Sequence, residues 1–478
     1  MNYKMIRNIL GWILLFEAGF MLVPAITAVV YWEKAFFSFL ITIGICLCAG
    51  LLLALKRPED TTLYSKEGFV IVSLSWITLS IFGALPFVIS GAIPNYIDAL
   101  FETVSGFTTT GASILAEVES LPKSILMWRS FTHWVGGMGV LVFIMAFLPL
   151  SGGNNMHIMR AESPGPSVSK LVPRVKTTAL ILYTIYFVLT LLEFIILLIA
   201  DMSVFDALNT SFATAGTGGF GIRNTSLADF SPALQVIVTV FMILFSINFT
   251  SFYLLLLFRF KEAFNSEIRW FLGIVATTII AITINARGAF ETLGEAVRNV
   301  SFTVASLIST TGFSTVDFDK WPEFSKNCLI VIMFIGACAG STGGGIKVSR
   351  LIILVKGMFK ELHTLLHPRQ IKKITVDSKP IEHEIIRSTN VYMITYLLIF
   401  VVSIIAISFD NHSFVTNFTA VAATINNIGP GLDLVGPTKN FALFSSPAKL
   451  VLIFDMLAGR LELFPMILLF TPATWKKR

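Results

Sequence analysis

Four short segments of the chain share a pattern of small and polar residues that ends in glycine. They are DALFETVSGFTTTG, DALNTSFATAGTGG, NVSFTVASLISTTG and TNFTAVAATINNIG, which end at Gly111, Gly219, Gly312 and Gly429. Glycine permits backbone conformations with positive φ, in which successive carbonyl groups can face one centre. Rings of carbonyls replace the hydration shell of K+ in selectivity filters. The pattern therefore predicts a cation site made by Thr110, Gly111, Gly218, Gly219, Thr311, Gly312, Ile428 and Gly429.

Other positions of the four segments also agree in type. Six residues before the glycine stand small residues: Ser105, Ala213, Ser306 and Ala423. Two residues before it stand polar ones: Thr109, Thr217, Thr310 and Asn427. Thirteen residues before it stand Asp98, Asp206, Asn299 and Thr416, which we expect to be helix N-caps. Each segment thus reads as a capped short helix whose negative C-terminal end favours a cation. The hydroxyls of Thr110 and Thr311 could add ligands.

The rest of the chain is composed like a protein that lies in a bilayer. Of its 478 residues 55% are hydrophobic and 13% charged, whereas soluble domains carry about 25% charged residues. Apolar stretches near the ~20 residues that cross a hydrocarbon core recur along the whole length. Ten are expected to span, beginning near Ile9, Ala35, Phe69, Ile125, Thr177, Ala233, Ile268, Cys328, Thr389 and Ala448.

Basic residues set the direction of these spans. Most of the 35 Lys and Arg lie in the N-terminal tail, in alternate connections and at the C-terminus, with a long run from Lys347 to Arg387. Cytoplasmic loops carry such an excess, so we expect both termini in the cytoplasm. The same reasoning accounts for the net charge of +6 without a nucleic-acid partner.

Each glycine segment lies between two spans, and every unit enters from the basic side. The predicted fold is an all-α polytopic membrane protein, with two extra N-terminal helices and four parallel helix–pore loop–helix repeats around a central ion pathway. The short helices must re-enter, because irregular backbone survives at that depth only inside protein or beside water. The predicted boundaries are 1–60 for the N-terminal helices, 61–152, 153–262, 263–360 and 389–478 for the repeats, and 361–388 for a basic cytoplasmic loop.

The eighth span is interrupted by GACAGSTGGGIKVSR, residues 336–350. About a dozen apolar residues precede this stretch, so the break falls near the middle of the bilayer. Each interior glycine costs a helix roughly 1 kcal/mol. The sequence predicts a gating loop across the ion path, and a static packing kink is the alternative; its residues are Ala337, Ala339, Gly340, Ser341, Thr342, Gly343, Gly344 and Gly345. The sixth span contains no glycine and is expected to run unbroken.

Arg460 lies inside the tenth span, where a charge is costly and usually faces a cavity or a partner. On a continuous helix it would point away from both Asp455 and Glu462. We expect it to face the pore just below the cation site. An ion pair with another helix is the alternative.

These motifs resemble the Trk/Ktr/HKT superfamily of potassium transporters. AESPGP at Ala161–Pro166, STTGFST at Ser309–Thr315 and GRLELF near the C-terminus are similar to the Trk branch, of the TrkH and TrkG type. The resemblance covers essentially the whole chain. It implies potassium uptake across the bacterial cytoplasmic (inner) membrane through a channel-like pore, a homodimer, and a TrkA-type cytoplasmic nucleotide-binding subunit. It implies K+ as the transported ion and no organic cofactor on this chain.

Within this family Gly111 is the residue that accompanies potassium preference. The chain departs from the pattern at Gly218, where a threonine is expected, and at Ile428 to Pro430. Two of the four segments therefore offer fewer side-chain ligands, which favours a looser selectivity than that of a fourfold-symmetric channel.

Two other classes of function are the alternatives. A carrier with alternating access, which would couple K+ to H+ or Na+, also uses broken helices, but it is typically built from inverted repeats. Here the repeats are parallel and four in number. An integral membrane enzyme has no support, because the sequence shows no clustered acid–base, nucleophile or phosphate-loop motif.

Overall fold

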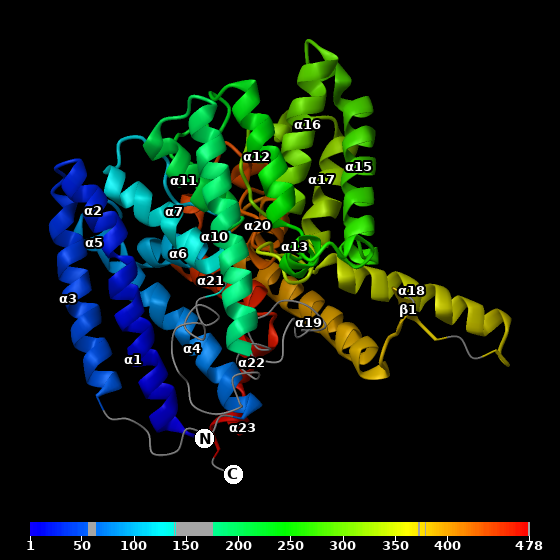
Figure 1. Ribbon diagram of the computed structural model, residues 1–478, viewed down its shortest axis with the longest axis horizontal. Coiled ribbons are helices and arrows are strands. Elements are labelled where there is room, and N and C mark those ends of the chain that lie inside the picture. Colours follow the sequence, from blue (N-terminus) through cyan, green and yellow to red (C-terminus); the bar gives the residue numbers. More distant parts are fainter. Residues whose placement is uncertain (56–63, 138, 140–174, 371–372, 378, 477–478) are drawn as a thin grey trace.

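The structure, a computed structural model, describes residues 1–55, 64–137, 139, 175–370, 373–377 and 379–476. Most of the expected second half of the fourth span, the AESPGP motif and Lys372 lie outside the described residues. The N-terminus and Trp475 lie close together (Figure 1), and the Tyr3 hydroxyl donates to Trp475 O (2.9 Å).

Two N-terminal helical segments pack beside the first unit. The first consists of α1 (Tyr3–Phe20) and α2 (Leu22–Val30), and the second is α3 (Ala35–Ala54). The backbones of α1 and α3 approach closely at Gly11 and Gly50, where an added Cβ would lie 2.7–3.0 Å from the other helix. α1 also contacts α4 (Ser65–Gly83), which begins the first unit.

The other elements follow in chain order. They are α5 (Leu85–Ile89), α6 (Tyr96–Phe107), α7 (Lys123–Gly137), α10 (Val175–Ile199), α11 (Val204–Ala215), α12 (Pro232–Phe245), α13 (Phe249–Leu256), α14 (Phe260–Ala263), α15 (Ser266–Ala286), α16 (Leu293–Ile308), α17 (Glu323–Ile335), α18 (Val348–Leu366), α19 (His383–Ile407), α20 (Phe414–Ile425), α21 (Ser446–Arg460), α22 (Phe464–Phe470) and α23 (Pro472–Trp475). Short 3-10 turns cover Arg287–Ala289, Phe318–Lys320, Ser408–Asp410, Asp433–Val435 and Phe441–Leu443.

The helices that are long and apolar enough to cross a membrane number six among the described residues, or seven if one bent pair is a single span. Ten were expected. The eighth and tenth candidates are each divided by a break, and the fourth continues into residues that are not described. Length and composition therefore support a polytopic helical protein with fewer uninterrupted spans than the sequence indicated.

Four short helices, α6, α11, α16 and α20, are linked by the helices that follow them. α7 contacts both α6 and α11, and α12 contacts both α11 and α16. In the same way α17 contacts α16 and α20, and α21 contacts α20 and α6. Each following helix thus packs against its own short helix and the next one, and the last contact returns to the first. The arrangement is a closed ring of four.

The short helices begin earlier than the expected N-caps. Their caps are Asn95, Ser203, Thr292 and Ser413, each of which accepts from a backbone N–H of the first turn. The prediction that Asp98, Asp206, Asn299 and Thr416 are caps is wrong. Asp98, Asp206 and Thr416 stand three residues inside their helices. The acidic ones were misread because a carboxylate in the first turn is favoured by the helix dipole as well.

The sixth span is broken, contrary to the sequence prediction. α12 and α13 are bent by 92° across residues 246–248. The side chain of Asn248 caps α13 by accepting from Thr250 N–H at 2.8 Å. Backbone groups freed by the bend bond to the loop between α17 and α18: Cys338 N–H donates to Ser246 O (3.1 Å) and Phe249 N–H donates to Gly340 O (3.0 Å). The backbone groups freed by the break in the sixth span thus form hydrogen bonds with those freed by the break in the eighth.

The basic segment after α17 is more structured than a plain loop. In Figure 1, α18 projects from the body of the molecule. It is followed by a small antiparallel pair of strands, β1 (Thr375–Val376) and β2 (Lys379–Pro380). These two strands are the exception to the expected all-α class in the described part of the chain.

Candidate cation site and the loop beside it

The four short helices end in the same turn. The second residue past each helix has a positive φ of 54–60°, in the left-handed region, and these residues are Thr109, Thr217, Thr310 and Asn427. In the first turn Thr109 N–H donates to Gly106 O (3.1 Å) and Thr110 N–H donates to Ser105 O (2.9 Å). The other three turns repeat both bonds. This pair of bonds is the Schellman motif, so the aligned small and polar positions are its acceptor and its left-handed residue.

The glycine that ends each segment meets the backbone of the next segment. All four glycines have positive φ, between 74° and 100°. A Cβ added to any of them would press on a carbonyl oxygen of the neighbouring segment, so side chains are excluded there. The contacts run from Gly111 to Gly218 O, from Gly219 to Thr311 O, from Gly312 to Ile428 O and from Gly429 to Thr110 O. These eight predicted site residues thus form one closed ring.

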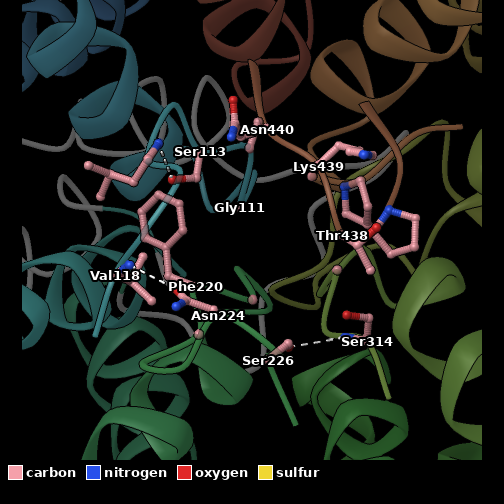
Figure 2. A pocket seen from close by; sticks show the side chains of 18 of the residues that line it. Gly111, Ser113, Val118, Phe220, Asn224, Ser226, Ser314, Thr438, Lys439 and Asn440 are labelled. Carbon is pink, nitrogen blue, oxygen red and sulfur yellow. Dashed lines mark hydrogen bonds between the residues drawn. The ribbon is translucent and has the colours of Figure 1, made fainter. Parts of the chain in front are cut away.

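The four glycines also line one cavity of about 130 Å³. The chain segments around it are joined to one another by hydrogen bonds. Val118 N–H donates to Asn224 Oδ1 (2.8 Å) and Ser314 N–H donates to Ser226 Oγ (3.2 Å), and Figure 2 shows both pairs. Phe441 N–H donates to Ser113 O (2.8 Å), which joins the fourth segment to the first. The cavity therefore lies on the axis of the ring.

The hydroxyls expected as possible ligands have partners in the protein. Thr110 Oγ1 lies 2.8 Å from Thr108 Oγ1 and accepts from Asn427 Nδ2 at 2.9 Å. Thr311 Oγ1 lies 2.6 Å from Ser309 Oγ. These side chains hold the turns in shape, which leaves backbone carbonyls as the ligands that the ring can offer.

A buried ion pair that the sequence analysis did not single out holds the first two segments together. Arg129 of α7 and Glu102 of α6 are 2.8 Å apart, and both side chains are almost fully buried. Glu102 also accepts from Ile114 N–H (3.0 Å), and Arg129 donates to Gly221 O (3.1 Å). The sequence did contain a signal for this pair, because charged residues inside membrane segments usually have a partner.

The predicted gating loop is non-helical, since α17 ends at Ile335 and α18 begins at Val348. Of its eight predicted residues, all except Gly340 and Gly345 are buried. The loop contacts the ends of two short helices. Gly344 N–H donates to Thr310 Oγ1 (2.6 Å) just after α16, and a Cβ on Gly344 would press on Asn426 O just after α20. The loop therefore lies directly beside the ring.

Arg460 is the last residue of α21 and touches this loop. Its guanidinium donates to Thr342 O (2.7 Å) and to the carbonyls of Gly136 (2.6 Å) and Gly137 (2.5 Å). The expected position of Glu462 on the same continuous helix is wrong. The helix ends at Arg460, and Glu462 has a φ of 65°. Glu462 instead pairs with Arg350 at the start of α18.

Two further charged side chains that the sequence analysis missed hold the loop. Glu267 Oε1 of α15 accepts from Ala339 N–H (2.7 Å) and from Ser349 N–H (3.1 Å), which lie toward opposite ends of the loop. The ammonium of Lys347, which is buried, donates to the carbonyls of Gly343 and Gly344. The loop is thus fixed by side chains from α15, from the turn after α16 and from α21, and by its own lysine.

Comparison with known proteins gives a consistent result. The family model TrkH, described as cation transport protein, matches residues 35–477. The Trk system potassium uptake protein TrkH of Escherichia coli K12 is 37% identical over 486 residues, with 100% of each chain covered. TrkG of the same strain is 32% identical over 483 residues, with 99% of each chain covered.

A solved structure agrees over the full length. The crystal structure of the potassium transporter TrkH from Vibrio parahaemolyticus superposes with a TM-score of 0.90 at 33% identity, covering 100% of both chains. These relatives are transporters and not enzymes. The chain belongs to the TrkH family of cation transport proteins.

Proposed function

We propose that this protein carries K+ into the bacterial cell through a channel-like pore whose selectivity filter is the ring of four glycine segments. The relatives named above are potassium uptake proteins, and the ring supplies a chemical reason for the same cargo here. Backbone carbonyls at the ends of four converging helices favour a cation both as ligands and through the helix dipoles.

One observation carries the proposal: the closed contact ring from Gly111 through Gly219 and Gly312 to Gly429. Four segments that are far apart in the chain present the same turn to a single cavity. Glycines that served only for close packing of helices would not all need a positive φ and a contact with a carbonyl of the next segment. The eight residues from Thr110 to Gly429 named above are therefore the proposed ion-binding set.

The loop from Ala337 to Gly345 is the proposed gate. It is held in place by hydrogen bonds from several helices rather than by a helix of its own. Such a loop can leave the ion path when those bonds exchange for others, and α18 connects it to the cytoplasmic segment. Arg460 acts as a cation at the edge of the path that fixes the loop through Thr342.

The proposed setting is the bacterial cytoplasmic membrane, with both termini inside. We assign a homodimer and a TrkA-type nucleotide-binding subunit as partners. The projecting end of α18 exposes an apolar surface, which consists of Met358, Phe359, Leu362, Leu365 and Leu366. A second copy would cover it. Basic residues next to it, such as Arg369 and Lys373, suit docking of an acidic cytoplasmic partner.

The test uses Gly312→Ala, with Gly294→Ala as control. A Cβ at Gly312 meets Ile428 O in a left-handed backbone, whereas a Cβ at Gly294, in the first turn of the preceding helix α16, has open space. An uptake-deficient bacterium that depends on this protein should lose growth on low potassium, or its Rb+ over Na+ preference, with the first variant only. Wild-type growth and preference would refute the filter. Slow, saturating flux in liposomes would favour a coupled symporter.

A further inference from the structure

The second filter segment lacks a brace that two other segments possess. In the first segment Thr108 and Thr110 join their hydroxyls across the turn, and in the third Ser309 and Thr311 do so. The corresponding residues of the second segment are Gly216 and Gly218, which have no side chain. The turn has the same backbone geometry nevertheless. Something outside the segment must hold it.

The side chain in that space is His133 of α7, which is completely buried. A Cβ on Gly218 would overlap the His133 ring, and a Cβ on Gly216 would overlap the His133 carbonyl. The imidazole Nε2 accepts from Phe220 N–H at 3.2 Å, and Nδ1 lies 2.8 Å from Gly106 O. The imidazole thus bridges the first short helix, α6, and the irregular segment that follows Gly219.

These two contacts fix the form of the imidazole. A backbone N–H can only donate, so Nε2 facing Phe220 must be the unprotonated nitrogen. Nδ1 then carries the proton and donates it to Gly106 O. The ring therefore works as a neutral bridge with one donor and one acceptor. Arg129, one turn earlier on α7, adds a bond to Gly221 O in the same segment.

We propose that His133 is the positioning residue of the second filter segment and that, together with Gly218, it contributes to cation selectivity. The imidazole of His133 occupies the space that a threonine side chain at position 218 would need. Glycine at position 218 and histidine at position 133 therefore depend on each other. The inference rests on the proposed filter and adds to it a residue outside the four segments.

The first experiment compares His133→Ala with His133→Gln in reconstituted liposomes, by competition of Na+ with Rb+ uptake. Alanine removes both hydrogen bonds, and we expect the Rb+ over Na+ preference to fall about 2- to 10-fold, the range of a lost neutral hydrogen bond. Glutamine also offers one N–H and one acceptor oxygen, so it should keep most of the preference. His412→Ala, away from the ring, is the control.

The second experiment tests the shared space. Gly218→Ser alone should lower Rb+ uptake and preference, because its Cβ meets the imidazole. The double variant Gly218→Ser with His133→Ala should recover part of the loss, since the space is then free. If Gly218→Ser behaves as wild type, or if the double variant shows the sum of the two losses, the proposed complementarity is wrong.

The outcomes separate this inference from the filter itself. If His133→Ala keeps the wild-type preference while Gly312→Ala loses it, the filter stands and the positioning role falls. If neither variant changes the preference, the filter assignment falls. If His133→Ala does not fold, two variants that keep a side chain at position 133 still test the proposal. Wild-type uptake and preference in Gly218→Ser, or a lost preference in His133→Gln, would refute it.

Discussion

Replacing Glu267 with alanine should open the pore. The carboxylate stands at the start of α15 and is 9% exposed, and one of its oxygens accepts both Ala339 N–H and Ser349 N–H. These amides lie on the two sides of the glycine-rich stretch. A single side chain therefore holds the loop to a helix outside it, and its removal frees both attachments.

The size of the effect follows from these two bonds. A hydrogen bond to a charged group contributes about 1.5–3 kcal/mol. The freed amides can bond to water, because a cavity of about 290 Å³ adjoins Glu267, Ala339 and Ser349. We therefore take the value of one bond rather than two. At about 1.4 kcal/mol per factor of ten, the closed arrangement loses a factor of about 10 to 100 relative to the open one.

The assay is Rb+ efflux from liposomes that contain the protein without its nucleotide-binding partner. Glu267→Ala should raise the efflux rate, and Glu267→Gln should raise it less, because the amide oxygen still accepts both N–H groups. Glu262→Ala, whose side chain is half exposed and pairs with Arg259, is the control. Equal or lower efflux from a monodisperse Glu267→Ala protein would refute the role of Glu267 in holding a gate.

Three further predictions concern the loop, the ring and the cytoplasmic surface. Deleting Gly343 to Gly345 should raise Rb+ flux and reduce its dependence on the partner; unchanged or lower flux would favour a static kink. Arg129→Met should destabilise the protein by about 3–5 kcal/mol, because Glu102 is left as an unpaired buried charge. A wild-type melting temperature in detergent would contradict this. Charge reversal at Arg369, Lys372 and Lys373 should weaken copurification with the nucleotide-binding partner, and binding that survives at low salt would place the docking surface elsewhere.

The sequence alone indicated the ring because its geometry is local. A Schellman turn is formed by residues within one segment: Ser105 is an acceptor in it, Thr109 is its left-handed residue, and Gly111 follows it directly. Four copies of that pattern can be aligned without knowledge of the fold. The caps were placed wrongly by three residues in three helices, since Ser203 and Asp206, for example, both suit a first turn.

The break of the sixth span could not be read from its residues. Ser246, Ile247 and Asn248 include neither glycine nor proline, and the apolar pattern continues on both sides. The bend is stabilised by groups that are distant in the chain: Thr342 donates to Phe245 O from 97 positions away. Only the packing of two broken spans makes the bend favourable, and Asn248 as an N-cap was the sole local sign.

Buried polar partners were missed for a related reason. The partners of Arg460 are backbone carbonyls of α7 and of the loop, which the sequence analysis did not foresee. Backbone acceptors leave no trace in residue types. The same holds for His133, whose partners are Gly106 O and Phe220 N–H.

The most direct test of the filter is to locate the ion. A crystal of this protein grown with Rb+ in place of K+, measured for anomalous scattering at the rubidium edge, would show where the cation rests. We predict a peak on the ring axis, within coordination distance of the carbonyl oxygens of Thr110, Gly218, Thr311 and Ile428, and a weaker peak or none when Na+ replaces Rb+. Rb+ bound only at carboxylates away from the ring, with no peak between the four segments, would contradict the account.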